Sequence, residues 1–403
     1  MSDRASRNIA LYPWFRFSLN LVFWQAIWFL YFQSELSAAD AILLYVCYDL
    51  ASTAMEVPSG YMADRLGRRI TLLLSAAASL LGAVLLVFGG GFAAFALAQV
   101  LLGTSAACAS GTDSALLYES LAEAGREDEI EAQELRGWRF SFVALALSAS
   151  LGGVMSLYGY GWSFAATALA MAAALLLALC FAEPKRQSPT VRSEWARLLT
   201  LRDAFRHPTL IWLFALSVLM YGYSHLPFVF GQPYINEALS HVRLQAETPL
   251  VSGLVTALMM GVSVVTSLVA PQIRQRLGLP AILLLAYGIQ VAICLGLILS
   301  NAVVGIAFLF LRMVPNSLSR PFILATIQPH LQDQSRATYL SLQSFLGRLL
   351  FAASLYAVAG SASDTGAMSY PEIQRILTWY VGAGVICLAT LALTLGNAQL
   401  SAR

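Results

Sequence analysis

The sequence predicts an all-α polytopic membrane protein with 12 transmembrane helices. Of its 403 residues, 58% are apolar and only 11% are charged, whereas an average soluble domain has about 25% charged residues. The apolar residues form runs of about 20, the length that crosses roughly 30 Å of hydrocarbon as a helix. A soluble enzyme, a disordered chain and a collagen-like chain are therefore excluded.

The apolar runs give the order of the predicted spans along the chain. They lie at 11–32, 37–59, 70–90, 93–120, 134–157, 160–182, 208–231, 250–271, 280–300, 303–328, 337–360 and 373–396. We expect the first run to be a retained span, because it is long, carries Arg16 and lacks a small-residue cleavage site. An even number of spans places both termini on one side of the membrane.

The longest polar stretch divides these spans into two sets of six. It covers residues 183–207 and predicts an N-terminal bundle at 1–182 and a C-terminal bundle at 208–403. Within it, apolar residues such as Trp195 recur at helical spacing against arginines. This pattern favours an amphipathic helix on the membrane surface over a disordered basic linker.

The positions of Lys and Arg predict the orientation. Eighteen of the 24 basic residues lie in loops or tails on the side of the termini and two lie in loops on the opposite side. Basic loops stay in the cytoplasm, so both termini are predicted to be cytoplasmic. The other four basic residues are inside spans: Arg16, Arg312, Arg320 and Arg348.

The loop after the second span carries a specific motif. Residues 60–69 read G-Y-M-A-D-R-L-G-R-R, which resembles the G-x-x-x-D-R-x-G-R-[KR] signature loop of the major facilitator superfamily. The preceding E-V-P-S at 56–59, the segment 110–118 and Arg336-Ala337-Thr338 resemble a bacterial efflux-like branch of that superfamily. The resemblance implies two pseudo-symmetric six-helix bundles, a multi-pass protein of the bacterial inner membrane, a monomer, and alternating access.

The signature loop also has a physical interpretation of its own. Gly60 and Gly67 allow a tight turn, and Asp64 can cap a neighbouring helix, which the resemblance implies is the eleventh. An arginine paired with Glu119 would complete a cytoplasmic gate, while an ordinary positive-inside turn is the alternative. The predicted gate residues are Gly60, Asp64, Arg65, Gly67, Arg68, Arg69 and Glu119.

Three acidic residues inside spans are candidates for proton coupling, because an ionisable group at membrane depth is costly and usually functional. Asp49 and Glu56 are seven residues apart and share a helical face. Asp113 lies in the fourth span beside Ser110 and Gly111. The resemblance implies that the face of Asp49 and Glu56 meets the eleventh span, where Arg348 is placed to pair with either acid. A permanent ion pair that fixes helix register is the alternative, above all for Glu56.

Basic and polar residues inside spans predict a substrate cavity. The tenth span places Arg312, Asn316 and Arg320 on one helical face, with prolines between and beside them. Structural pairing of the arginines, and an interfacial aromatic belt for the seventh span, are the alternatives. The predicted cavity residues are Arg16, Asn20, Tyr223, His225, Arg312, Asn316, Arg320 and Arg348.

These patterns predict a secondary active transporter, with proton-coupled efflux of a small organic solute as the leading hypothesis. No G-x-x-x-x-G-K-[ST] motif is present, so ATP is not the expected driver, and no cofactor is expected. The four histidines form no ligand pair, and the five cysteines lie in apolar runs without metal-ligand spacing. An intramembrane enzyme and a metal site are therefore not expected.

Two alternatives to efflux stay open. The export element G-P-x-x-G-G lacks its proline here, since residues 148–153 read S-A-S-L-G-G. Proton-driven uptake of an organic anion, such as a metabolite or a metal chelate, is the first alternative. A lipid flippase or scramblase, in which the same arginines would hold head groups, is the second.

Overall fold

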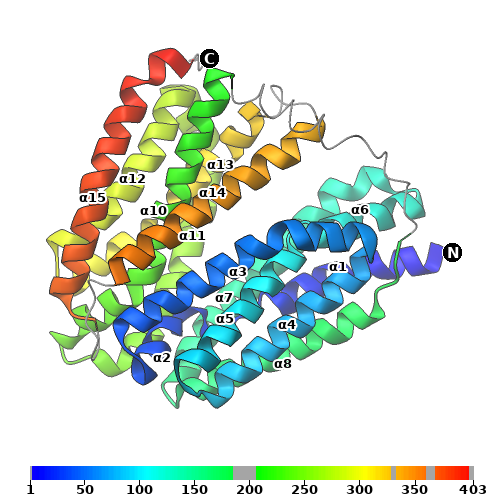
Figure 1. Cartoon of the computed structure of the whole chain (residues 1–403), viewed down its shortest axis with the longest axis horizontal. Helices are drawn as coiled ribbons and strands as arrows, with labels where there is room; N and C mark the ends of the chain where they lie inside the picture. Colours follow the sequence, from blue (N-terminus) through cyan, green and yellow to red (C-terminus); the bar gives the residue numbers. More distant parts are fainter. Residues whose placement is uncertain (1, 185–205, 328–332, 360–367, 399–403) are drawn as a thin grey trace. The chain divides into compact units, whose positions relative to one another are not determined.

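The protein is all-α, as the sequence predicts. A computed structural model describes residues 2–184, 206–327, 333–359 and 368–398, and these residues contain no strand (Figure 1). They include 11 helices long and apolar enough to cross a membrane. The predicted count of twelve spans stays a prediction, and the amphipathic helix expected within 183–207 falls largely on residues outside the described ranges.

Two compact units make up the chain. Unit 1 comprises Met1–Thr190 together with Pro249–Leu254, and unit 2 comprises Val191–Thr248 together with Val255–Arg403. The helices of unit 1 are α1 (Ser2–Leu19), η1 (Phe23–Ala26), α2 (Trp28–Glu35), α3 (Ala38–Arg65), α4 (Arg68–Phe88), α5 (Gly91–Ala109), α6 (Thr112–Ala124), η2 (Glu127–Glu129), α7 (Ile130–Ser156) and α8 (Tyr160–Cys180). In this unit α3 and α4 pack on α5, α4 packs on α8, and α1 packs on α6, α7 and α8.

Unit 2 contains α10 and the helices that follow it. They are α10 (Pro208–Ser240), η3 (Gln245–Glu247), α11 (Thr248–Leu277), α12 (Leu279–Leu299), η4 (Val303–Leu311), α13 (Val314–Ile327), α14 (Asp333–Ala359), α15 (Tyr370–Leu393) and η6 (Leu395–Ala398). Helix α10 packs on α12, α14 and η4, and α12 packs on α13 and α15. Helix α10 continues to Ser240, well past the expected end at 231, and carries Pro227 and Pro233 inside it.

The first predicted span is not one helix, which corrects the expectation for residues 11–32. Helix α1 ends at Leu19, and the chain bends through residues 20–22 before η1. Backbone polar groups exposed at such a break need partners inside a membrane protein. The amide of Phe23 donates to Thr167 Oγ1 at 3.0 Å, and Gln25 Nε2 donates to the carbonyl of Leu145 at 2.9 Å.

The fourth and tenth predicted spans are also divided. Helices α5 and α6 are separated at Ser110 and Gly111, where Gly111 adopts a φ of 73° that favours glycine. In the tenth span, η4 is a 3-10 helix that ends at Leu311, and α13 begins at Val314. The expected single helical face is therefore wrong, because Arg312 lies at the junction and precedes the helix that carries Asn316 and Arg320.

The signature loop is shorter than expected. Helix α3 runs to Arg65 and α4 begins at Arg68, so only Leu66 and Gly67 join them. Gly67 has a φ of 116° and supplies the turn. Gly60 lies inside α3 without a positive φ, so its expected role in a tight turn is wrong.

Gly152 on α7 provides a test of how the break in the first span is held. A Cβ at this position would overlap the carbonyl group of Phe23. We expect Gly152→Ala to lower the free energy of unfolding by about 1–3 kcal/mol, because overpacking forces backbone to move. Thermal unfolding of the detergent-solubilised protein measures this loss.

The matched control for that substitution is Gly161→Ala on α8. A Cβ at Gly161 meets no atom within 4 Å, so its effect is expected to stay within about 0.5 kcal/mol. Equal stability of the two variants would contradict the close approach of α7 to Phe23.

Candidate functional site

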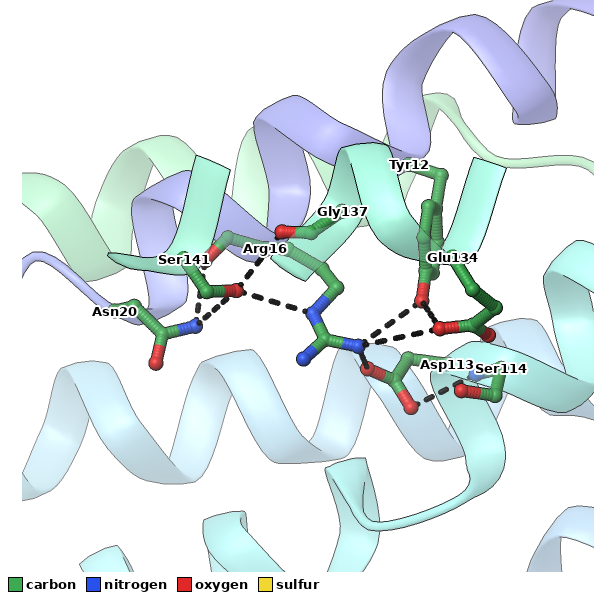
Figure 2. Close-up of polar contacts among 8 residues, drawn as sticks. All are labelled: Tyr12, Arg16, Asn20, Asp113, Ser114, Glu134, Gly137 and Ser141. Carbon is green, nitrogen blue, oxygen red and sulfur yellow. Dashed lines mark hydrogen bonds and ion pairs between the residues drawn. The ribbon is translucent and has the colours of Figure 1, made fainter. Parts of the chain in front are cut away.

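A buried charge cluster in unit 1 is the candidate site. Figure 2 shows the guanidinium of Arg16 between two carboxylates, with Nη1 lying 3.3 Å from Asp113 Oδ2 and 3.8 Å from Glu134 Oε2. The same nitrogen donates to the hydroxyl of Tyr12 at 3.0 Å, and that hydroxyl donates to Glu134 Oε2 at 3.1 Å. The side chains of Arg16, Asp113 and Glu134 are 11%, 15% and 23% exposed, so little water screens the cluster.

A second set of contacts fixes the orientation of the arginine. Arg16 Nε donates to Ser141 Oγ at 3.2 Å, and Ser141 Oγ donates to the carbonyl of Gly137 at 3.1 Å. Asn20 Nδ2 donates to the same serine oxygen at 3.2 Å and to the carbonyl of Arg16 at 2.7 Å. The guanidinium carbon also lies 4.6 Å from the ring centre of Trp138, within the range of a cation–π contact.

Helical spacing explains how three elements bring these groups together. Tyr12 and Arg16 are four residues apart on α1, which places them on one face, and Glu134 and Ser141 are seven residues apart on α7. Asp113 is in the first turn of α6, where the helix dipole favours a carboxylate. Its Oδ1 accepts a hydrogen bond from the amide of Ser114 at 2.8 Å.

The cluster is suited to hold and release a proton. It contains one permanent positive charge and two carboxylates on the same guanidinium nitrogen. With both acids ionised the cluster carries a net negative charge, and binding of one proton makes it neutral. Burial increases the energetic difference between these two states.

The sequence predicted part of this cluster. Arg16 and Asn20 were expected together in the substrate cavity and Asp113 in the proton-coupling set, so the contact of Arg16 with Asp113 was not predicted. Tyr12 and Glu134 were missed. The four-residue spacing between Tyr12 and Arg16 is the signal that points to Tyr12. Glu134 was the first residue of a predicted span, and the sequence did not indicate that helix α7 begins one turn earlier, at Ile130.

The signature loop of unit 1 forms a second group of contacts. Arg68 Nε pairs with Glu119 Oε1 at 3.1 Å, and the guanidinium of Arg65 lies over the ring of Tyr61 at 5.3 Å. Glu119 and Asp113 therefore have different partners, as expected. The side chain of Asp64 and those of Arg336, Ala337 and Thr338 lie outside the described residues, so their gate contact stays a prediction.

Glu183, which sequence reasoning missed, caps the start of α4. Its two carboxylate oxygens accept hydrogen bonds from the amides of Arg68 at 2.8 Å and Arg69 at 2.9 Å. The guanidinium of Arg69 donates to the carbonyl of Leu179 at 3.1 Å. A carboxylate at a helix N-terminus is favourable, so this contact holds the signature loop against the end of α8.

Other charged groups of unit 1 have separate environments. Asp49 is buried on α3 and Glu56, two turns further on, is half-buried. The expected pairing of either acid with Arg348 stays a prediction. In the loop before α7, hydrogen bonds from Arg126 to Glu129 at 2.6 Å lower the pKa of that carboxyl.

The cavity candidates of unit 2 are distributed over several environments. Tyr223 is buried and its hydroxyl donates to the carbonyl of Tyr380 at 2.6 Å, which is a packing contact between α10 and α15. Asn316 is half-buried and Arg320 is exposed. Arg312 is half-buried, and its guanidinium lies 4.7 Å from the ring centre of Phe228.

This architecture defines a multi-pass helical membrane protein with ionisable groups inside its helical bundle. The family model of the Major Facilitator Superfamily matches residues 10–355. The chain belongs to this superfamily and is a membrane transporter rather than an enzyme. Among the described residues, no group of three or more His, Cys, Asp or Glu side chains is arranged to hold a metal ion.

Solved transporters share this fold. The nucleoside transporter NupG superposes with a TM-score of 0.74 at 13% identity, covering 96% of this chain and 99% of NupG. The POT family transporter PepTSo gives 0.75 at 12% identity, with coverage of 100% and 99%. A bacterial homologue of the human lysosomal transporter Spinster gives 0.68 at 15% identity, with coverage of 98% and 97%. No match was found among curated protein sequences.

A double-mutant cycle tests the charge balance of the cluster. We expect Arg16→Gln to lower the free energy of unfolding by about 2–3 kcal/mol, because two acids lose their counter-charge. This loss is somewhat smaller than for a fully buried ion pair, since the side chains are partly exposed. Adding Asp113→Asn should restore part of this loss, because only one carboxylate then remains. Chemical unfolding of the single and double variants in detergent measures the coupling.

Arg139→Gln is the control for this cycle. Arg139 is exposed on the same helix, α7, and its loss is expected to change stability by less than about 0.5 kcal/mol. Strict additivity of the Arg16 and Asp113 effects would show that the two side chains do not form a functional pair.

A second double-mutant cycle tests the contact between the Glu183 carboxylate and the N-terminus of α4. Gly67→Ala is expected to cost about 1–3 kcal/mol from backbone strain, plus the overlap of its Cβ with the Glu183 carboxylate. The double variant Gly67→Ala/Glu183→Ala should therefore be more stable than the sum of the single effects predicts. Gly159→Ala, at a φ of 133° and a ψ of 137° close to those of Gly67, places its Cβ only in ordinary contact with Trp162 and isolates the strain in thermal unfolding.

Proposed function

We propose that this transporter is a secondary carrier which couples movement of a small organic solute to protons at the Arg16–Asp113–Glu134 cluster. The observation that carries the proposal is that two half-buried carboxylates from α6 and α7 reach one nitrogen of Arg16. A buried group that changes charge with a single proton is the physical requirement for proton coupling.

The coupling step follows from the two distances. Arg16 Nη1 is 3.3 Å from Asp113 and 3.8 Å from Glu134, so either carboxylate can be its main partner. When a proton neutralises Asp113, the guanidinium keeps Glu134 and Tyr12 as partners on α7 and α1. The attachment of α6 to α1 then weakens, which gives protonation a mechanical consequence.

The signature loop and the acids of α3 are assigned to the remaining parts of the transport cycle. We place the signature loop, with the Arg68–Glu119 pair and the Glu183 cap, at the cytoplasmic gate of an alternating-access cycle. Asp49 and Glu56 serve as further proton carriers on α3. The asymmetry of its basic loops supports cytoplasmic termini. Its membership of the superfamily supports a monomer in the bacterial inner membrane.

Export is the direction we propose first, and uptake of an organic anion is the alternative. The half-buried Arg312 of unit 2 favours an anionic group on the solute. A lipid flippase would use the same arginine for a head group. Proton movement that depends on addition of a solute is expected for an exporter or an importer of that solute. It is not expected for a lipid flippase.

Proton coupling is tested in inverted membrane vesicles that hold an imposed pH gradient. Addition of a transported organic solute from a panel should collapse the gradient, as read by a pH-sensitive acridine dye. We expect Asp113→Asn and Glu134→Gln to abolish this response, because the neutral amides cannot release a proton. Solute exchange without a gradient should persist, since binding itself does not need the proton.

The control carboxylate is Glu129, which is paired with Arg126 on a loop outside the cluster. Glu129→Gln should leave the dye response unchanged. A solute response that persists in both cluster variants would exclude the cluster as the coupling site. The sign of the pH change on solute addition distinguishes export from uptake.

A further inference from the structure

One face of α10 in unit 2 combines aromatic rings with a histidine. Tyr221, His225 and Phe228 are spaced i, i+4 and i+7 and therefore share a side of the helix. The rings of Tyr221 and His225 lie 4.3 Å apart at 34°. His225 Nδ1 lies 2.7 Å from the carbonyl of Tyr221, and because a carbonyl only accepts, Nδ1 carries the proton there.

Helix α14 packs against this face and brings a cation to it. A Cβ on Gly347 would lie 3.0 Å from Tyr221 Cβ, which shows how closely the two helices approach. One turn further on, the ring of Phe351 lies 5.5 Å from that of His225. Arg348 follows Gly347 directly, and its charge acts on His225.

A second cation reaches the same face from the junction of η4 and α13. The guanidinium of Arg312 lies 4.7 Å from the ring centre of Phe228, and its charge also acts on His225. Both arginines are half-buried, as are Tyr221, His225 and Phe228. Two guanidinium groups and the rings of Tyr221, Phe228 and Phe351, from three elements, are therefore near His225.

The acidic residues of unit 2 are distributed differently. Its described helices carry Glu237, Glu247, Asp333 and Glu372 near their ends, and Glu372 accepts hydrogen bonds from Ser369 in a capping box. The charges near the middle of the described helices of unit 2 are basic. Within unit 2, the described charges nearest the aromatic face of α10 are therefore basic, and basic groups attract anions.

We propose that this group of side chains binds the anionic head and the planar ring of a small aromatic organic acid. The group comprises Tyr221, His225, Phe228, Arg312, Arg348 and Phe351, and is called the arginine–aromatic cluster. The inference rests on the proposed transport function, and it adds the chemical class of the solute.

The chemistry of the cluster supports this class of ligand. A guanidinium presents a planar fork of N–H donors that matches a carboxylate or phosphonate. The half-buried rings of Tyr221 and Phe228 offer faces and edges for an aromatic substituent. The buried ring of Phe351 packs against His225 and supports this face. A neutral amide of the same shape would gain the ring contacts but not the charge-assisted hydrogen bonds.

Ligand binding to the full-length protein in detergent tests this inference. The probes are benzoate, phenylphosphonate, the neutral isostere benzamide, the cation benzylamine and short-chain dihexanoyl phosphatidic acid. Each is titrated while the midpoint of thermal unfolding is recorded against that of the same variant without ligand. We expect benzoate and phenylphosphonate to raise the midpoint at concentrations at which benzamide and benzylamine do not.

Variants of the two arginines assign the effect to the cluster. Arg312→Gln and Arg348→Gln should each weaken benzoate binding by about 10- to 100-fold, because a charge-assisted hydrogen bond is lost. Arg312→Lys should retain more affinity for benzoate than Arg312→Gln, since it keeps the charge while losing the planar fork. Arg375→Gln, an exposed arginine of α15, is the control and should bind benzoate as the native protein does.

Three outcomes would overturn the inference. They are equal binding of benzoate and benzamide, unchanged benzoate binding in both glutamine variants, and stabilisation by phosphatidic acid alone. The assay contains no pH gradient, so it measures ligand binding independently of proton coupling. Loss of proton coupling would therefore leave the binding result intact, and loss of benzoate binding would leave the coupling proposal intact.

Discussion

Unit 1 depends on the neutralisation of one guanidinium inside a helical bundle. Arg16 lies where water is scarce, and an uncompensated charge there costs several kcal/mol. Asp113, Glu134, Tyr12 and the ring of Trp138 surround it. Because these partners come from three helices, the same contacts that stabilise the charge also hold α1, α6 and α7 together. A proton added to one carboxylate changes a local charge and a tertiary contact at the same time.

Breaks in the helices place the partners of that arginine. The left-handed Gly111 ends α5 and allows α6 to begin at Thr112, so Asp113 stands in a first turn where the helix dipole stabilises its charge. The break after Leu19 is held by Thr167 and by the absence of a side chain on Gly152. Irregular backbone inside a membrane protein needs such partners, so these breaks are part of the site and not interruptions of the fold.

The two units carry different chemistry. In the described part of unit 1, the buried polar cluster joins one arginine to two acids, whereas the α10 face of unit 2 gathers two arginines, a histidine and aromatic rings. A pair of acids is suited to protons, and a pair of guanidinium groups is suited to anions. Our proposed division of proton and solute recognition between the units rests on this asymmetry. The Glu183 cap adds a third element, since it ties the end of α8 to the signature loop.

The sequence by itself determined the all-α membrane class, most of the spans and the superfamily, because apolar runs of membrane length and the G-Y-M-A-D-R-L-G-R-R loop are local patterns. It also identified Arg16 and Asp113 as costly charges that need a function. Only the tertiary structure decided that they contact each other, that Glu134 and Tyr12 complete the cluster, and that the first, fourth and tenth spans are divided. Hydropathy averages over about 20 residues, so it cannot register a two-residue break, and it placed Glu134 only at the edge of a predicted span. The pairing of charges depends on which helices pack together, and that information is not local to any segment of the chain.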